Sequence, residues 1–192
     1  FARLSTPTHV AVDPGNGYYY IADEGNRRIR YVDPANGIIF TYAGNGSSAS
    51  AGDGGPARWG VFASIDSVAT DVAGSTLYVA DSVASRIRAV DRPSNVIRTA
   101  IGTGTPGFSG DGGAASTAQI SSPTTVVLDA ARNVFFTDTA NQRVRRVNAT
   151  TGVITTVAGS GTQGFAGDGG PAIAAALNTP RALALHSATS TL

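Results

Sequence analysis

Aspartate and arginine recur along this chain at nearly constant spacing, and they are the residue types here that could do chemistry. Asp23, Asp81 and Asp138 follow one another at intervals of 58 and 57 residues. Five residues after each aspartate comes an arginine, and these are Arg28, Arg86 and Arg143. A carboxylate can act as a general base and a guanidinium group can bind phosphate, so the pairs are candidates for catalysis or nucleic-acid binding.

The repetition itself favours a structural interpretation of these pairs. A catalytic site needs one asymmetric constellation, whereas an aspartate at a strand end caps the next turn wherever that turn occurs. We therefore expect the three arginines to be mostly buried between repeating units and hydrogen-bonded to aspartate or to backbone carbonyls. A second arginine follows two residues after each, on the same strand face, as Arg30, Arg88 and Arg145.

Charge and composition exclude several classes of protein. There are 14 basic and 13 acidic residues, a net charge of +1, and every basic residue is arginine. A nearly neutral chain without a basic tract is not typical of nucleic-acid binders. No apolar run approaches 18 residues, so we expect no membrane insertion. The chain has no cysteine, which excludes disulfides and cysteine-ligated metal sites.

A Gly-Asp-Gly-Gly motif also recurs three times, centred on Asp53, Asp111 and Asp168. Calcium needs six to eight oxygen ligands, and one carboxylate per loop is too few. We therefore expect tight glycine turns in which each aspartate is a local cap, with no metal ion and no cofactor. Phe108 and Phe165 precede two of these turns and are expected to pin the loops to the neighbouring sheet.

The remaining candidates for a site are two histidines and two glycosylation triplets. His9 and His186 occupy non-equivalent places in their repeats and cannot supply a metal-binding set. Asn45-Gly46-Ser47 and Asn148-Ala149-Thr150 fit the N-glycosylation pattern, in positions expected to be exposed. Each triplet is equally typical of an ordinary turn asparagine.

Three full copies of one unit, with a fourth beginning, position these residues. Each copy alternates runs of Val, Ile, Tyr, Phe and Thr with Gly, Asn and Pro clusters, which predicts four short strands joined by hairpin turns. A long loop follows, in which residues 171–177 are expected to form one helical turn. The predicted sheets cover about 7–43, 65–101 and 123–158, with a lone strand near 181–185.

Four short strands per repeat, evenly spaced, are typical of a β-propeller. A single four-stranded sheet cannot bury both of its faces, whereas stacked sheets bury them on each other. A β-solenoid is the alternative, but its repeats are usually shorter. We therefore expect an all-β fold: a partial ring of three four-stranded blades plus the first strand of a fourth, as a single domain over 1–192. The repeats are about 7–64, 65–122 and 123–179, and a fourth starts at 180–192.

The repeats resemble those of the NHL-repeat propellers. The resemblance lies in Pro7-x-x-Val-Ala-Val-Asp, in Asp138-Thr-Ala-Asn-Gln-Arg-Val-Arg, and in Ile154-Thr-Thr-Val-Ala-Gly. The Gly-Asp-Gly-Gly-Pro-Ala loops resemble a subtype found in extracellular proteins. The second copy departs from the pattern, since Ile65 replaces the proline and Ala84 replaces the asparagine.

The resemblance implies a ring of six blades, which would need about 340 residues. We therefore expect a non-catalytic interaction or structural module of an extracellular or cell-surface protein. Its partners would be other protein chains or further blades of the same protein, and a glycan is a further candidate. Two alternatives remain: a propeller enzyme, a metal-dependent lyase or hydrolase with its site in other blades, or a bacterial sensor domain.

Overall fold

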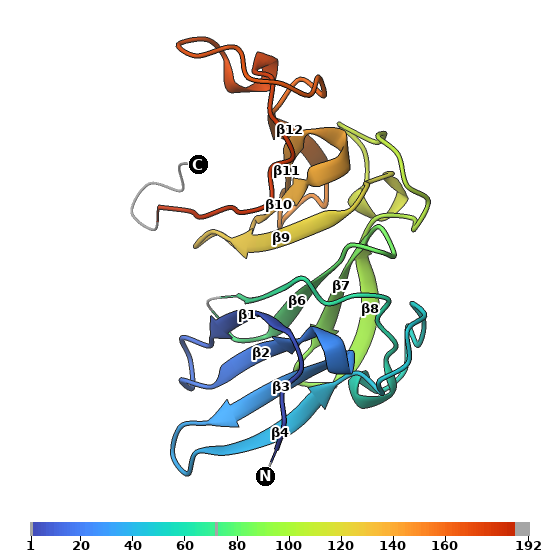
Figure 1. The fold of residues 1–192 in the computed structure, drawn as a ribbon, viewed down its shortest axis with the longest axis vertical. Helices are drawn as coiled ribbons and strands as arrows, with labels where there is room; N and C mark the ends of the chain where they lie inside the picture. The colour runs from blue at the N-terminus through green and yellow to red at the C-terminus, as the bar shows by residue number, and fades with distance from the viewer. Residues whose placement is uncertain (1, 72, 187–192) are drawn as a thin grey trace.

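The computed structural model describes residues 2–71 and 73–186, which form three four-stranded antiparallel sheets. Each sheet is one blade, and its strands pair in chain order (Figure 1). Blade 1 contains β1 (Pro7–Val12), β2 (Tyr19–Asp23), β3 (Arg28–Asp33) and β4 (Ile38–Ala43). Blade 2 contains β5 (Ser67–Thr70), β6 (Thr76–Asp81), β7 (Arg86–Asp91) and β8 (Val96–Ile101). Blade 3 contains β9 (Pro123–Leu128), β10 (Val134–Asp138), β11 (Arg143–Val147) and β12 (Ile154–Ala158).

The predicted propeller blades are confirmed, and short polar turns explain why each repeat folds as a meander. In the turn between β3 and β4, Asp33 Oδ1 accepts the Ala35 N–H at 2.9 Å. Gly37 then adopts a φ of +67°, which few residues other than glycine tolerate. The helical segments of the described residues are single 3₁₀ turns: η1 (Glu24–Asn26), η2 (Ala57–Trp59), η3 (Ala115–Thr117), η4 (Thr139–Asn141) and η5 (Ala172–Ala174). None of them is long enough to cross a membrane.

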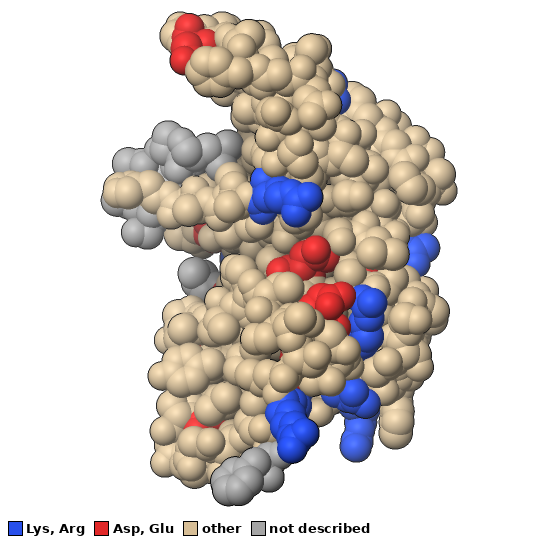
Figure 2. Space-filling view, viewed as in Figure 1, with Lys and Arg blue, Asp and Glu red and all other residues tan. Residues whose placement is uncertain are grey.

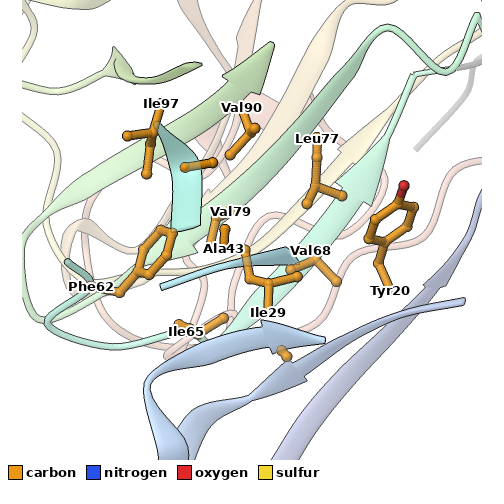
Figure 3. Packing of buried hydrophobic residues seen from close by; sticks show 12 residues of the cluster. Tyr20, Ile29, Ala43, Phe62, Ile65, Val68, Leu77, Val79, Val90 and Ile97 are labelled. Carbon is orange, nitrogen blue, oxygen red and sulfur yellow. The ribbon is translucent and has the colours of Figure 1, made fainter. Parts of the chain in front are cut away.

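The apolar core lies between the blades. One cluster joins Ile29 of blade 1 to Val68, Leu77 and Val79 of blade 2, and all four side chains are fully buried (Figure 3). A second cluster joins blades 2 and 3 in the same way and includes Ile87 and Phe136. Alternation along each strand sends one set of side chains toward the preceding blade and the other toward the following blade. The stack therefore supplies the burial that one sheet lacks.

The prediction of a strand near 181–185 is wrong for the described structure, because these residues form no strand. They nevertheless run beside β9, where Thr124 Oγ1 donates to the Arg181 carbonyl at 3.0 Å. Just before them, Thr139 Oγ1 of η4 donates to the Pro180 carbonyl at 2.7 Å. In each blade the first strand pairs with the second strand of its own sheet. No such partner for residues 181–185 lies within the described part of the chain.

Candidate functional site

The repeated aspartates at the ends of β2, β6 and β10 are completely buried and fasten the chain that enters each blade. Asp138 accepts the Ser121 N–H at 2.7 Å and the Asn141 side-chain amide at 2.8 Å. Asp23 and Asp81 accept backbone N–H groups from the equivalent segments. Burial raises the pKa of Asp81 and Asp138, although the hydrogen bonds they accept oppose this shift. These contacts give the three aspartates a structural role.

Arg28, Arg86 and Arg143 are only half-buried and donate their hydrogen bonds within their own repeats, which corrects the expectation of burial between blades. Arg143 donates to the Asn141 carbonyl at 3.0 Å and to the Ser160 carbonyl at 2.6 Å. Arg28 and Arg86 donate to the equivalent carbonyls of Asn45 and Thr103. The carbonyl partners were expected, but no aspartate in the described part of the chain pairs with these arginines. The arginines bind these carbonyls because the loop that leaves the fourth strand folds back over the start of the third strand.

A glycine makes room for each of these guanidinium groups. Gly161 has a φ of +93°, and a Cβ there would overlap Nη1 of Arg143. Gly46 and Gly104 stand in the same relation to Arg28 and Arg86. The glycine is therefore needed both for its backbone conformation and for the space that its missing side chain leaves.

The arginines that join blades are the second of each pair, Arg88 in β7 and Arg145 in β11. Both are completely buried. Sequence reasoning placed them on the same strand face as Arg86 and Arg143 but assigned them no partner. Their constant position, seven residues after the buried aspartate, was the signal that could have identified them.

Arg145 binds the Gly-Asp-Gly-Gly loop of the preceding repeat. Its Nη2 donates to Asp111 Oδ1 at 2.6 Å and to the Ser109 carbonyl at 2.8 Å, and its Nη1 donates to the Gln119 carbonyl at 3.0 Å. Asp111 Oδ2 also accepts the Thr156 N–H of β12 at 3.1 Å. One loop carboxylate thus binds both the third and the fourth strand of the next blade.

The first loop makes the same contacts with blade 2. Arg88 pairs with Asp53 and donates to the Ala51 and Val61 carbonyls at 3.2 Å each. Asp53 Oδ2 accepts the Thr99 N–H of β8 at 3.0 Å. We call this set of contacts the latch: a loop aspartate, a buried arginine on the third strand of the next blade, and a backbone N–H on its fourth strand.

The latch sets the ionisation of its aspartates. Partial burial alone would raise the pKa of Asp53 and Asp111. The hydrogen bonds from Thr99 and Thr156, together with the charges of the two arginines, outweigh burial and hold both pKa values below the ordinary range. The aspartates are therefore charged at neutral pH, where the ion pairs with Arg88 and Arg145 are complete.

Backbone hydrogen bonds extend each latch along the outer strand. Gly112 N–H donates to the Ile154 carbonyl at 2.8 Å, and Ile154 N–H donates to the Gly113 carbonyl at 3.0 Å. Gly54 and Gly55 bind Ile97 of blade 2 in the same way. The loop thus covers the edge of β12 or β8, which would otherwise leave its N–H and C=O groups unpaired.

Phe108 fulfils its expected role and Phe165 does not. The Phe108 ring lies under the Arg143 guanidinium at 3.7 Å and under that of Arg145 at 4.9 Å, which are cation–π contacts. Phe165 occupies the equivalent place in the third loop but is 88% exposed. Its contacts require an arginine from a following blade, and the described part of the chain supplies none at that place. Asp168, in the same loop, is likewise exposed.

Blade 1 presents the opposite half of the same interface. Val10 is 55% exposed and Tyr19 is 41% exposed, whereas their equivalents in blade 2, Val68 and Leu77, are fully buried against blade 1. Arg30 stands at the place of Arg88 and lies 3.5 Å from Asp23 of its own blade. Among the described residues, the stack therefore has an unfilled interface at each end.

The glycosylation triplets lie on turns. Asn45 and Asn148 are both half-buried, which differs from the expected exposure. The Asn45 side-chain oxygen accepts the Ser47 N–H at 2.9 Å, and that of Asn148 accepts the Thr150 N–H at 2.9 Å. Both therefore cap local turns. Across the face drawn in Figure 2, basic and acidic side chains are interspersed. Within the described residues, no three His, Asp or Glu side chains are grouped as metal ligands.

Comparison with known proteins supports the fold. No family model matches the chain. It is 29% identical over 189 residues to the protein Suppressor of Quenching 1, chloroplastic, of Arabidopsis thaliana, a match that covers 95% of this chain and 18% of that protein. The chain therefore spans less than a fifth of this curated relative.

Two solved structures from Bacteroides share the architecture. A protein of unknown function from Bacteroides thetaiotaomicron matches with a TM-score of 0.70 and 18% identity, covering 92% of this chain and 41% of that one. An auxiliary nutrient binding protein from Bacteroides ovatus matches with a TM-score of 0.66 and 19% identity, covering 96% and 44%. The chain spans less than half of either structure. With the three stacked sheets, these likenesses show that it has a β-propeller fold.

Proposed function

We propose that this chain is a non-catalytic interaction and structural module, a section of an NHL-type propeller with the Gly-Asp-Gly-Gly-Pro-Ala loop. One observation carries the proposal: the buried arginines and loop aspartates join blades, and at both ends of the stack the same interface lacks a partner among residues 2–71 and 73–186. The auxiliary nutrient binding protein of the same fold supports a binding role for the architecture. The partners would be further blades of the same protein or other protein chains.

The open face of blade 1 supports a protein partner. Covering an exposed Val or Tyr side chain contributes about 1.5–3 kcal/mol when burial is complete. Val10 and Tyr19 stand on this face beside Ile21 and Val32, whose equivalents in blade 2 are fully buried. An apolar face of this kind is the surface that each blade offers to the one before it.

We further propose that the protein is extracellular or on the cell surface. The two triplets at Asn45 and Asn148 and the loop subtype support this location, whereas the name of the Arabidopsis relative is that of a chloroplast protein. Peptide mass spectrometry on material from the native source separates the two locations. A glycan on either asparagine supports secretion, and unmodified peptides from protein that never enters the secretory route contradict it.

The proposed module predicts that residues 1–192 do not form a free-standing monomer. The chain is expressed alone, and its hydrodynamic size is measured against concentration together with its thermal unfolding. We expect concentration-dependent association and a broad transition. A Val10→Asp, Tyr19→Asp variant should associate less, because these exposed side chains do not hold the fold together. A compact monomer with a sharp, reversible transition would contradict the proposal.

A further inference from the structure

A cavity walled by tyrosines lies between blades 1 and 2, and none of the latch residues line it. Its volume is about 380 Å³, and its walls include four tyrosines of blade 1 and two residues from turns of blade 2: Tyr18, Tyr20, Tyr31, Tyr42, Gly74 and Arg92. Figure 3 shows Tyr20 at the edge of the apolar cluster that joins the two blades, and the other three tyrosines are partly buried against that cluster. The cavity therefore begins where the apolar packing between the blades ends.

The aromatic rings hold one another in place across the strands of blade 1. The rings of Tyr18 and Tyr31 stack with their centroids 5.5 Å apart, and Tyr42 meets Tyr20 edge to face at 5.1 Å. Phe40 stacks on Tyr31 at 5.1 Å and extends the row to the surface, where it is 42% exposed. Because these contacts fix the rings in advance, a ligand would not have to order them.

Packing between blades does not require most of these rings. At the equivalent places of blade 2, each 58 residues further along the chain, the residues are Thr76 for Tyr18, Ala89 for Tyr31, Arg98 for Phe40 and Ala100 for Tyr42. Blade 2 nevertheless packs on blade 3 through an apolar cluster of its own. Of the five aromatic residues, only Tyr20 has an aromatic equivalent in blade 2, which is Tyr78. The other four therefore distinguish this cavity and are not a requirement of the fold.

An ion pair between the blades forms one side of the cavity. Arg92 pairs with the buried Asp13, and its guanidinium group lies over the Tyr20 ring at 5.4 Å. A Cβ at Gly74 would lie 2.7 Å from Arg92 Nη1, so the glycine leaves room for the pair. Because the two charges offset each other, the pair gives little net attraction to an anion or to a cation. The cavity is therefore suited to a neutral ligand.

The tyrosine hydroxyl groups indicate what kind of neutral ligand fits. Tyr42 Oη is buried and makes no hydrogen bond of normal geometry with any described residue. Burial raises the pKa of Tyr20 and of Tyr42, and the charge of Arg92 only partly opposes this shift, so both hydroxyl groups stay protonated at neutral pH. A buried hydroxyl group without a partner costs free energy. A ligand that carries several hydroxyl groups would remove that cost.

We propose that this cavity binds a neutral saccharide unit. A sugar ring presents C–H groups on its faces, which pack against aromatic rings, and hydroxyl groups at its edge, which can exchange hydrogen bonds with tyrosine hydroxyl groups and with Arg92. The volume of about 380 Å³ lies in the range of pockets that hold small ligands. A flat aromatic ligand with few polar atoms would leave the tyrosine hydroxyl groups unpaired.

The inference rests on the proposed binding role of the module, but the two can fail separately. A chain that associates with itself and binds no saccharide keeps the proposed module and loses the saccharide site. A compact monomer that binds a saccharide in this cavity does the reverse.

The experiment screens the 192-residue chain against neutral mono- and disaccharides by saturation-transfer NMR, and against immobilised saccharides on a glycan array. We expect at least one neutral saccharide to bind with millimolar or better affinity. Binding of a free sugar assigns the site to small saccharides, and binding only on the array assigns it to the end of a glycan chain.

Variants then locate the bound saccharide. The triple variant Tyr18→Thr, Tyr31→Ala, Tyr42→Ala gives blade 1 the residues with which blade 2 folds, and it should weaken binding by about tenfold or more. Tyr42→Phe removes one hydroxyl group and keeps the ring, so it should weaken binding by about threefold to tenfold. Trp59→Ala is the matched control, because it removes an aromatic ring that is 62% exposed outside the cavity, and it should leave binding unchanged.

Four results would overturn the proposal. The first is the absence of saccharide binding in both screens by a chain that circular dichroism shows to be folded. The second is an affinity that Tyr42→Phe leaves unchanged, a measurement that decides the matter even where the triple variant does not fold. The third is binding that Trp59→Ala abolishes, which would place the sugar on that exposed ring. The fourth is binding of indole or tetramethylammonium, but of no saccharide, that the triple variant abolishes, which would assign the cavity to another class of ligand.

Discussion

The two arginines on each third strand differ in burial although they are only two residues apart. Arg145 is completely buried and lies between Asp111 of the preceding loop and Asp138 of its own blade, 3.5 Å away. Arg143 is half-buried and binds backbone carbonyls. A buried charge that loses its partner is costly, whereas a half-exposed group can exchange its partner for water.

We therefore expect Arg145→Ala to lower the free energy of unfolding by about 3–5 kcal/mol, because Asp138 would remain buried without its counter-charge. Arg143→Ala should cost only about 1–2 kcal/mol, mainly from lost carbonyl hydrogen bonds and the contact with Phe108. Urea denaturation of both variants measures the difference. Equal losses would show that burial does not separate the two arginines.

The latch aspartates also predict a pH dependence. The folded pKa of Asp111 lies below its unfolded value, so its stabilisation is present above about pH 4 and is lost as the pH falls through the folded pKa. The stability difference between the wild type and Asp111→Asn should therefore shrink as the pH falls from about 5 to about 2. Denaturant titrations across this range measure it, and a constant difference would contradict the assignment.

The pH dependence of stability that comes from Asp138 should have the opposite sign to that from Asp111. Burial raises its folded pKa, so the folded state takes up a proton more readily than the unfolded chain. Its contribution to stability then falls as the pH rises from the unfolded pKa through the folded one. Acid therefore weakens the contacts between blades at Asp111 while relieving the cost of a buried charge at Asp138.

At the level of elements, the outer strands differ in whether a loop covers their edge. Residues 52–57 cover β8 and residues 110–115 cover β12, through backbone hydrogen bonds to Ile97 and Ile154. β4 is the equivalent strand of blade 1, and no described loop binds the N–H of Ile39. An uncovered edge strand can pair with another chain.

Amide hydrogen exchange should follow this difference. We expect the Ile39 amide to exchange much faster than those of Ile97 and Ile154, because the latter two donate to Gly55 and Gly113 carbonyls. NMR-detected exchange on the 192-residue chain resolves the three positions, and Val32 of the central strand β3 serves as a protected reference. Similar protection at all three isoleucines would mean that something covers β4.

The strands and turns were predictable from the sequence because their signals are local. Alternating β-branched residues and turns such as Asp33–Gly37 determine hairpins over a few residues. The partners of Arg88 and Arg145 were not predictable in this way. They lie 35 and 34 residues away in sequence, and the contact depends on how a long loop returns to the next blade. Residues 181–185 were predicted as a strand from repeat alignment, which carries no information on pairing.

At the scale of the whole molecule, three similar sheets are held by one kind of interface used twice. Each interface combines an apolar cluster with a latch. The apolar cluster supplies non-directional burial, while the latch fixes how one blade sits on the next. The number of repeats was readable from the sequence, but the open interfaces became visible only once equivalent positions could be compared for burial.

The central claim is that the latch couples a loop to the following blade, and a double-mutant cycle on Asp53 and Arg88 tests it most directly. The account predicts a coupling energy of about 1–2 kcal/mol, reduced from that of a buried pair because Asp53 is partly exposed. Asp53 with Arg145, which belong to different latches, is the control pair and should be additive. Additive losses for Asp53 and Arg88 would contradict the account.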